Sequence, residues 1–304
     1  MVEYLKKIAA ANGNRLEIVS IERMRLLETE INNVVFDEEM LDYVNFIKSY
    51  FYKFDEVPEN MKSVIILAVS KTSYANVSFM KNGKVYKAFS PTAADLEKAM
   101  GSIVGYVKEA GYEISPVFHL PLKRLAVQSG LAEYGKNNIA YVQGYGSNIV
   151  FAAFYTNIVC EGDNWRDTVV ADKCTDCGLC MKNCPTDAIN KDSFMINAKR
   201  CLSYFHVSGE GYPDWMPETA HHSLYYCLKC QVGCPMNEGL GTVIDVTFDE
   251  KETDLILTGK SFNNDVPESF EKKVKLLGFG QWHSVSRNLK VLLEVMEKGV
   301  VVSC

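Results

Sequence analysis

Eight of the ten cysteines in this 304-residue chain lie between Cys174 and Cys234. Such clustering is typical either of disulfides in small secreted domains or of a metal site. Residues 174–185 read CTDCGLCMKNCP, the C-x2-C-x2-C-x3-C-P spacing of bacterial ferredoxins. A structural zinc site needs two cysteine pairs and has no use for a third close thiolate or the trailing proline. The spacing therefore predicts iron–sulfur clusters.

A second run, CLKCQVGCP at residues 227–235, repeats the end of the first, and Cys201 stands alone between the two. Eight thiolates suffice for two [4Fe-4S] clusters, and in two-cluster ferredoxins the fourth cysteine of each run binds the other cluster. We therefore expect cluster 1 to be held by Cys174, Cys177, Cys180 and Cys234. We expect cluster 2 to be held by Cys184, Cys201, Cys227 and Cys230. The alternative, in which each run closes on itself, would leave no crossing between the sites.

The remaining candidate ligands have simpler interpretations. Cys160 follows an apolar stretch and Cys304 is the last residue, so we expect a small buried side chain and a terminal thiol. Eight thiolates already complete two clusters. His206, His221 and His222 are therefore expected to be hydrogen-bond partners or surface groups rather than iron ligands.

Composition sets limits on the partners. The formal net charge is −6 and 47% of the residues are apolar, as in ordinary globular proteins. An acidic chain is a poor nonspecific binder of nucleic acid, so no DNA partner is expected, although a local basic patch could still contact RNA. No apolar run is long enough for a membrane helix, and the first residues do not read as a signal peptide. We expect a cytoplasmic protein without a membrane partner.

The rest of the chain predicts an α+β fold. Residues 63–70 (SVIILAVS) and 148–157 (NIVFAAFYTN) read as buried strands. Between them, Thr92 as N-cap and Asp95 at the third helical position predict a helix start. Helical periodicity recurs at residues 3–11, 38–51, 270–277 and 285–296, and residues 251–264 are polar. The expected domains are an α/β domain at 1–165, a ferredoxin-like module at 166–245 and a helical segment at 246–304.

One glycine-rich loop imitates a phosphate-binding motif. Residues 130–136 read GLAEYGK, but Asn137 stands where magnesium would need a Ser or Thr hydroxyl. The preceding residues, 124–129, read as a helix rather than the strand that such a loop requires. We therefore expect no nucleotide site, and we expect the glycines to allow close approach to a flat or large group.

Four stretches together resemble a known family. They are residues 124–157, the Cys174 run, and the segments CLSY at 201–204 and CQVGCPMN at 230–237. They resemble epoxyqueuosine reductase, a cobalamin-dependent, two-cluster enzyme of tRNA modification that shares its corrinoid-binding core with reductive dehalogenases. The resemblance implies an N-terminal nitroreductase-like α/β domain that holds cobalamin beside the ferredoxin-like module. It places near the corrinoid Gly130, Leu131, Tyr134, Gly135, Lys136 and Asn137.

The chain also departs from that family. Glu113 replaces the aspartate that the family carries as a candidate proton donor, and residues 87–91 (KAFSP) replace a basic and aromatic segment. The chain lacks the export signal of the dehalogenases, and Lys136 stands where they are expected to have arginine. The substrate class, small-molecule or tRNA-borne, is left open by these departures.

The sequence as a whole predicts an iron–sulfur oxidoreductase. Two clusters relay electrons from a low-potential donor of ferredoxin or flavodoxin type to a cofactor, cobalamin, in the N-terminal domain. Tyr134 and Glu113 are the candidate catalytic proton donors. Two alternatives remain: an electron-transfer protein, and a corrinoid reductive activator with no organic substrate of its own.

Overall fold

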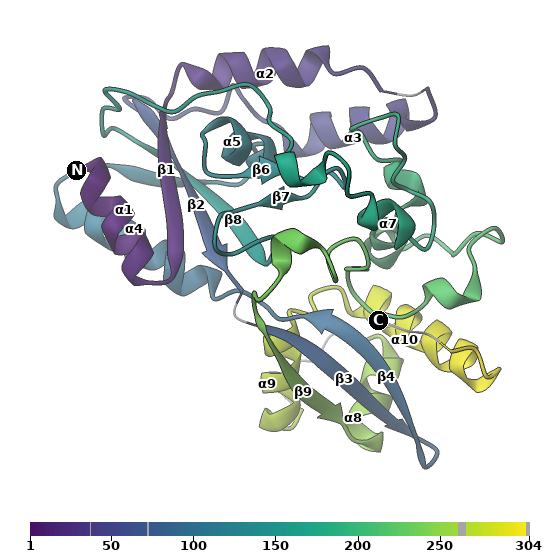
Figure 1. Cartoon of the computed structure of the whole chain (residues 1–304). Coiled ribbons are helices and arrows are strands. Elements are labelled where there is room, and N and C mark those ends of the chain that lie inside the picture. The colour runs from purple at the N-terminus through teal and green to yellow at the C-terminus, as the bar shows by residue number, and fades with distance from the viewer. Residues whose placement is uncertain (37, 72, 261–265, 302–304) are drawn as a thin grey trace. The chain divides into compact units, whose positions relative to one another are not determined.

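The computed structural model describes residues 1–36, 38–71, 73–260 and 266–301. Two units form by packing, each from two stretches of chain. The first unit contains residues 1–70 and 94–177, and the second contains residues 71–93 and 178–304 as far as they are described. Helices and strands are mixed in both (Figure 1), so the expected α+β class is confirmed.

The first unit is built on a four-stranded antiparallel sheet in the order β1-β2-β8-β5. Its strands are β1 (Asn14–Ser20), β2 (Ser63–Ser70), β5 (Ile114–Val117) and β8 (Ile149–Thr156). The short strands β6 (Glu133–Tyr134) and β7 (Ala140–Tyr141) pair separately. The two strands predicted from apolar runs, β2 and β8, are confirmed as neighbours at the centre of this sheet.

Helices cover both faces of that sheet. α1 (Val2–Ala11) and α4 (Leu96–Glu109) pack on one face, whose core includes Leu5, Ile65, Ile103 and Phe154. α5 (Leu122–Gln128) contacts β2 and β8 from the other side. The unit also contains α2 (Arg23–Asn33), the 3-10 helix η1 (Glu38–Met40), α3 (Leu41–Phe51) and the 3-10 helix η2 (Asp172–Cys174). β2 is buried on both faces, which explains why its sequence is continuously apolar.

One predicted helix start is wrong in detail. α4 begins at Leu96, and its N-cap is Asp95, whose carboxylate accepts a hydrogen bond from the amide of Lys98. Thr92 does not cap the helix, because α4 begins at Leu96 and Asp95 is therefore the residue at the N-cap. The hydroxyl of Thr92 donates instead to the carbonyl oxygen of Ser73, the first residue of β3, at 2.6 Å.

The second unit is built on a three-stranded sheet in the order β4-β3-β9. β3 (Ser73–Lys81) and β4 (Lys84–Pro91) form an antiparallel hairpin, and β9 (Thr242–Phe248) pairs with β3 in parallel. Through this long-range pairing the hairpin belongs to the second unit, whereas β2 and β5, the strands before and after it in sequence, belong to the first. The packing therefore differs from the three consecutive segments expected from the sequence, although the helical C-terminal part is present.

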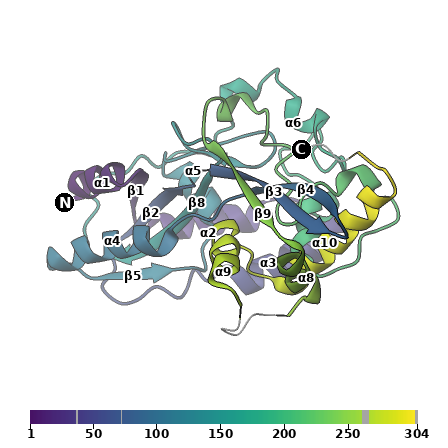
Figure 2. The ribbon, with the colours of Figure 1, turned by 90° about the horizontal axis from the view of Figure 1, so that it is seen from below.

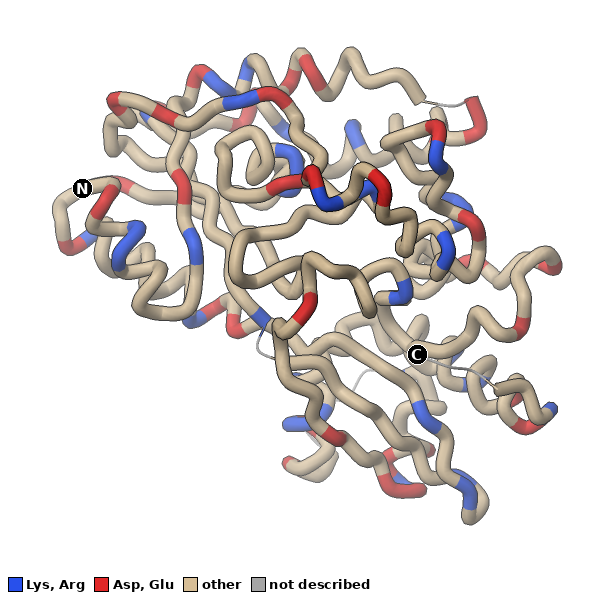
Figure 3. Tube along the Cα trace, in the orientation of Figure 1, with Lys and Arg blue, Asp and Glu red and all other residues tan. Residues whose placement is uncertain are grey.

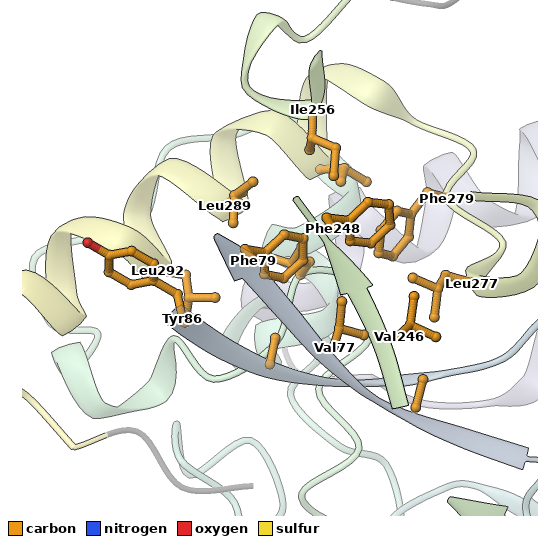
Figure 4. Close-up of a cluster of buried hydrophobic side chains, with 14 of the residues drawn as sticks. Val77, Phe79, Tyr86, Val246, Phe248, Ile256, Leu277, Phe279, Leu289 and Leu292 are labelled. Atoms are coloured by element: carbon orange, nitrogen blue, oxygen red, sulfur yellow. The ribbon is translucent and has the colours of Figure 1, made fainter. Parts of the chain in front are cut away.

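Three C-terminal helices lie against one face of this sheet (Figure 2). They are α8 (Glu250–Thr258), α9 (Glu268–Leu277) and α10 (Trp282–Glu297), of which only α9 and α10 were predicted. Phe79 and Phe248 stack at the centre of this core with ring centroids 5.4 Å apart (Figure 4). The remaining elements of the unit are α6 (Leu179–Lys182), α7 (Leu202–Ser208) and the 3-10 helices η3 (Ala198–Arg200), η4 (Glu218–Ala220) and η5 (Pro235–Asn237).

Adjacent positions on β3 provide a test of this core. Replacing the fully buried Phe79 with alanine is expected to lower the free energy of unfolding by about 3–5 kcal/mol, because the cavity cannot collapse completely. Met80 points to the other face and is 41% exposed, so Met80→Ala is expected to change it by less than about 0.5 kcal/mol. Urea unfolding followed by circular dichroism measures both, and equal losses would contradict the assignment of the two faces.

Candidate iron–sulfur site

The first cysteine run folds into short turns. Cys174 ends η2, and Cys177 is exposed. Gly178 has φ +63°, a left-handed conformation that favours glycine, and it starts α6, which carries Cys180. Cys184 follows α6, and its sulfur accepts a hydrogen bond from the amide of Ala188 at 3.3 Å. Turns and one-turn helices therefore separate the successive cysteines of this run.

The later cysteines lie in the second unit at the ends of short elements. Cys201 is the N-cap residue of α7. The amide of Cys227 donates to the hydroxyl of Ser203, in the first turn of α7, at 3.0 Å. Two non-glycine residues with positive φ, Tyr226 (62°) and Leu228 (61°), flank Cys227. Such conformations carry strain and concentrate at functional positions.

Three of the four cysteines expected at cluster 2 interact electrostatically within the second unit. Burial raises the pKa of Cys227 to about 12, and the nearby thiols of Cys201 and Cys184 raise it further. Burial also raises the pKa of Cys201, with a smaller contribution from Cys184. Deprotonating several neighbouring thiols that are shielded from water is unfavourable, and the binding of iron to the thiolates compensates for it. Cys230 follows Cys227 in the same loop, so this donor set fits a four-iron cluster.

Cys234, the fourth cysteine expected at cluster 1, is the N-cap residue of the 3-10 helix η5, which begins at Pro235. Assignment of the eight cysteines to two clusters stays a prediction. Among the described residues, no three His, Cys, Asp or Glu side chains converge to hold a single metal ion. In a cluster each thiolate binds a different iron atom, which is a separate geometric requirement.

All three histidines of the module are buried, so the surface interpretation is wrong for them. His222 is a hydrogen-bond partner, as expected: Nδ1 lies 2.6 Å from the carbonyl oxygen of Ala220 and Nε2 lies 2.7 Å from that of Cys227. The same Nε2 is 3.7 Å from the sulfur of Cys227. Neither ring nitrogen of His206 has a hydrogen-bond partner in the described part of the chain. Cys160 is half-buried, and Cys304 lies outside the described residues.

The glycine-rich loop is held by its own side chains. It follows α5, a helix, as expected for a loop that is not a nucleotide site. A Cβ at Gly135 would lie 2.6 Å from both Asn137 Oδ1 and Tyr141 Cε2, so only glycine fits there. Asn137 is 2% exposed and donates to the hydroxyl of Tyr141 at 2.9 Å. Leu131 and Lys136 are half-buried.

The structure places the two candidate proton donors in different surroundings. Tyr134 in β6 is 3% exposed, and burial raises the pKa of its phenol well above the usual value, so the group stays protonated. Glu113 is exposed and precedes β5, whereas α5 and the glycine-rich loop follow the other end of that strand. The structure therefore does not group them as one acid–base pair. Residues 87–91, which depart from the family, form the end of β4.

Residues 173–237 match a family model described as a 4Fe-4S double cluster binding domain. In sequence, the chain is 36% identical over 115 residues to epoxyqueuosine reductase of Listeria monocytogenes, covering 38% of this chain and 29% of that relative. It is 32% identical over 148 residues to the enzyme of Lactococcus garvieae, covering 46% and 41%. The chain thus spans 29% and 41% of the length of these two curated relatives.

The fold is also similar to that of a solved epoxyqueuosine reductase. The structure from Streptococcus thermophilus matches with a TM-score of 0.66 and 19% identity over 97% of this chain and 81% of that one. The cysteine-rich part of the chain is thus similar to iron–sulfur domains of the double-cluster class. The chain's resemblance to the epoxyqueuosine reductases, expected from the sequence, is confirmed. No helix among the described residues is long and apolar enough to cross a membrane.

The burial of His206 predicts that acid lowers the free energy of unfolding. Burial lowers the pKa of His206 to about 3, and the nearby His222, His221 and Arg287 lower it further. Below pH 6.5 the unfolded chain therefore binds a proton that the folded chain does not, and stability falls as the pH drops toward 3. At pH 5, His206 is expected to lower the free energy of unfolding by about 2 kcal/mol relative to pH 7.

Comparing urea unfolding at pH 7 and pH 5 tests this. His206→Leu is expected to lose less stability than the parent chain between the two pH values, with His221 and His222 accounting for part of what remains. His283→Leu, at an exposed position of α10, is the matched control and is expected to follow the parent. Identical pH dependence in the parent and His206→Leu would refute the role of His206.

Proposed function

We propose that this chain is an iron–sulfur reductase of the epoxyqueuosine reductase type. In this proposal, two [4Fe-4S] clusters deliver electrons to a corrinoid held by the first unit. The observation that carries the proposal is the combination of the double-cluster match at residues 173–237 with a fold shared over 97% of the chain. A ferredoxin alone would need only the cysteine module, whereas here a complete sheet-and-helix unit accompanies it.

The cysteines would divide as the crossing rule of two-cluster ferredoxins requires. Cluster 1 would be held by Cys174, Cys177, Cys180 and Cys234. Cluster 2 would be held by Cys184, Cys201, Cys227 and Cys230. The raised pKa values of Cys201 and Cys227, to which the nearby Cys184 contributes, support the second set.

A corrinoid, when bound, would supply a strongly reducing cobalt centre for cleaving a bond of the substrate. The loop residues near it would be Gly130, Leu131, Tyr134, Gly135, Lys136 and Asn137. The side chains of Tyr134 and Asn137 are buried within the protein. Contact with the corrinoid would therefore be made by the backbone of the loop and by the side chains of Leu131 and Lys136. Buried polar atoms without partners also occur in this unit, at Arg124 Nε, Gln128 Oε1 and Thr168 Oγ1. Such orphaned atoms fit a polar group or water absent from the protein itself.

The relatives name epoxyqueuosine, carried on tRNA in one solved complex, as the substrate of those proteins. We propose a substrate of this class or a small molecule of similar chemistry, reduced in the cytoplasm with electrons from a low-potential ferredoxin or flavodoxin. Basic and acidic residues are interspersed along both units (Figure 3), and residues 173–237 contain six of each. RNA recognition would therefore depend on a few local contacts rather than on net charge.

Among the chain's own residues, Glu113 is better suited than Tyr134 to meet a substrate from solvent. Its carboxyl group is exposed, and its backbone is fixed by the amide of Glu113, which donates to Asn157 Oδ1 at 2.8 Å. A protonated carboxyl group there could deliver a proton without crossing the core. Tyr134 would serve to shape the loop.

The first experiment is anaerobic reconstitution with iron and sulfide, followed by titration with cob(II)alamin and electron paramagnetic resonance. About eight irons per chain, as two four-iron clusters require, together with a cobalt signal altered by binding, are the expected result. The same iron content without any cobalt change would overturn the corrinoid proposal and leave an electron-transfer protein. Reduction of a partner's corrinoid, with no turnover of epoxyqueuosine tRNA, would favour the reductive activator.

Single cysteine variants test the ligand assignment. Cys201→Ser is expected to halve the iron content to about four per chain, because cluster 2 loses a thiolate ligand. Cys160→Ser is the control and is expected to keep all eight, since Cys160 lies outside both cysteine runs and its thiol donates to the carbonyl oxygens of Ile18 and Gly162. Iron and sulfide analysis after reconstitution measures both, and full iron retention in Cys201→Ser would remove Cys201 from the ligand set.

A further inference from the structure

One buried side-chain amide in the second unit has hydrogen-bond partners for both its oxygen and its nitrogen. Asn288 of α10 is 2% exposed. Its Oδ1 accepts hydrogen bonds from the hydroxyl of Tyr212 at 2.6 Å and from Nε of Arg287 at 3.1 Å. Its Nδ2 donates to the carbonyl oxygens of His206 at 3.1 Å and Leu224 at 2.7 Å. Buried polar groups satisfied on all sides fix one arrangement of the segments they join.

The neighbouring Arg287 extends this contact. Its guanidinium donates to the carbonyl oxygens of Phe205 and Glu210, and it lies over the ring of Tyr212 with 5.0 Å to the centroid. Two consecutive residues of α10 therefore hold the last turn of α7 and the chain that follows it. All these partners belong to residues 205–224.

That stretch lies between two expected ligands of cluster 2. Residues 202–226 separate Cys201 from Cys227, and their regular structure consists only of α7 and η4. A chain this irregular does not fix the spacing of its ends by itself. Cys201 caps α7, while Leu224, held by Asn288, lies three residues before Cys227. The amide of Cys227 also donates to Ser203 in the first turn of α7, so the two ends are joined directly at one point. The contacts made by α10 restrain the intervening chain, which that single hydrogen bond does not hold.

We propose that Asn288, assisted by Arg287, is a positioning residue for cluster 2. The C-terminal helix α10, which lies outside the matched residues 173–237, then forms part of the framework of that cluster site. This inference rests on the proposed function only for the presence of two clusters, and it is independent of the corrinoid and of the substrate.

A matched control lies on the same helix. Ser286 is 3% exposed, and its hydroxyl donates to the carbonyl oxygen of Leu257 at the C-terminal end of α8, at 2.9 Å. Ser286→Ala therefore removes a buried hydrogen bond from α10 without touching residues 205–224. A general loosening of the helix would affect both variants alike.

The test uses the full chain, reconstituted anaerobically and reduced with dithionite. Asn288→Ala is expected to lose about half of its iron and one of the two reduced-cluster signals in electron paramagnetic resonance. Ser286→Ala is expected to keep both. Full iron with unchanged spectra and midpoint potentials in Asn288→Ala, or equal iron loss in the two variants, would overturn the inference.

A milder variant covers the case in which Asn288→Ala does not fold. Tyr212→Phe removes only the hydroxyl that donates to Asn288. It is expected to retain iron but to shift the midpoint potential of one cluster relative to the other. If neither potential moves, the inference fails. A parent chain that binds fewer than two clusters would overturn the proposed function as well, so the two failures are distinguishable.

Discussion

The constraint on which the second unit depends is the gathering of partly buried thiols. Cys184 lies close enough to Cys201 and Cys227 to raise the pKa of both, and Cys201 also raises the pKa of Cys227, in surroundings that already disfavour the thiolate. The polypeptide must therefore hold together thiols that resist the deprotonation that iron binding requires. Short turns, a residue with left-handed φ on each side of Cys227, and a dense set of hydrogen bonds from α10 all serve this requirement.

The sequence predicted the features that neighbouring residues encode and missed those that depend on residues far apart in the chain. The cysteine spacing predicts the cluster chemistry because an iron–sulfur loop is encoded within a dozen residues. β2 and β8 were found because strands covered on both faces are continuously apolar. β3, β4 and β9 were missed, since β3 pairs with a strand about 170 residues later in the chain and alternates between buried and exposed positions.

The same contrast between local and long-range features holds at the candidate site. The sequence shows the spacing of the cysteines, but it does not show that the histidines are buried, because segments distant in the chain bury them. Thr92 and Asp95 are both good caps by type, and the start of α4 at Leu96 places Asp95, not Thr92, at the N-cap. Asn288 carries no local signal at all, since a single asparagine in an amphipathic helix reads as a surface residue.

These non-local contacts give the C-terminal region a role that its sequence does not suggest. α8, α9 and α10 share a core with the β3–β4 hairpin and β9, and α10 also bonds to the chain between two of the expected cluster ligands. A hydrophobic core of this size provides a rigid base, and the buried amide transmits that rigidity to the loop. Cluster geometry and stability of the C-terminal core are therefore expected to be coupled within this unit.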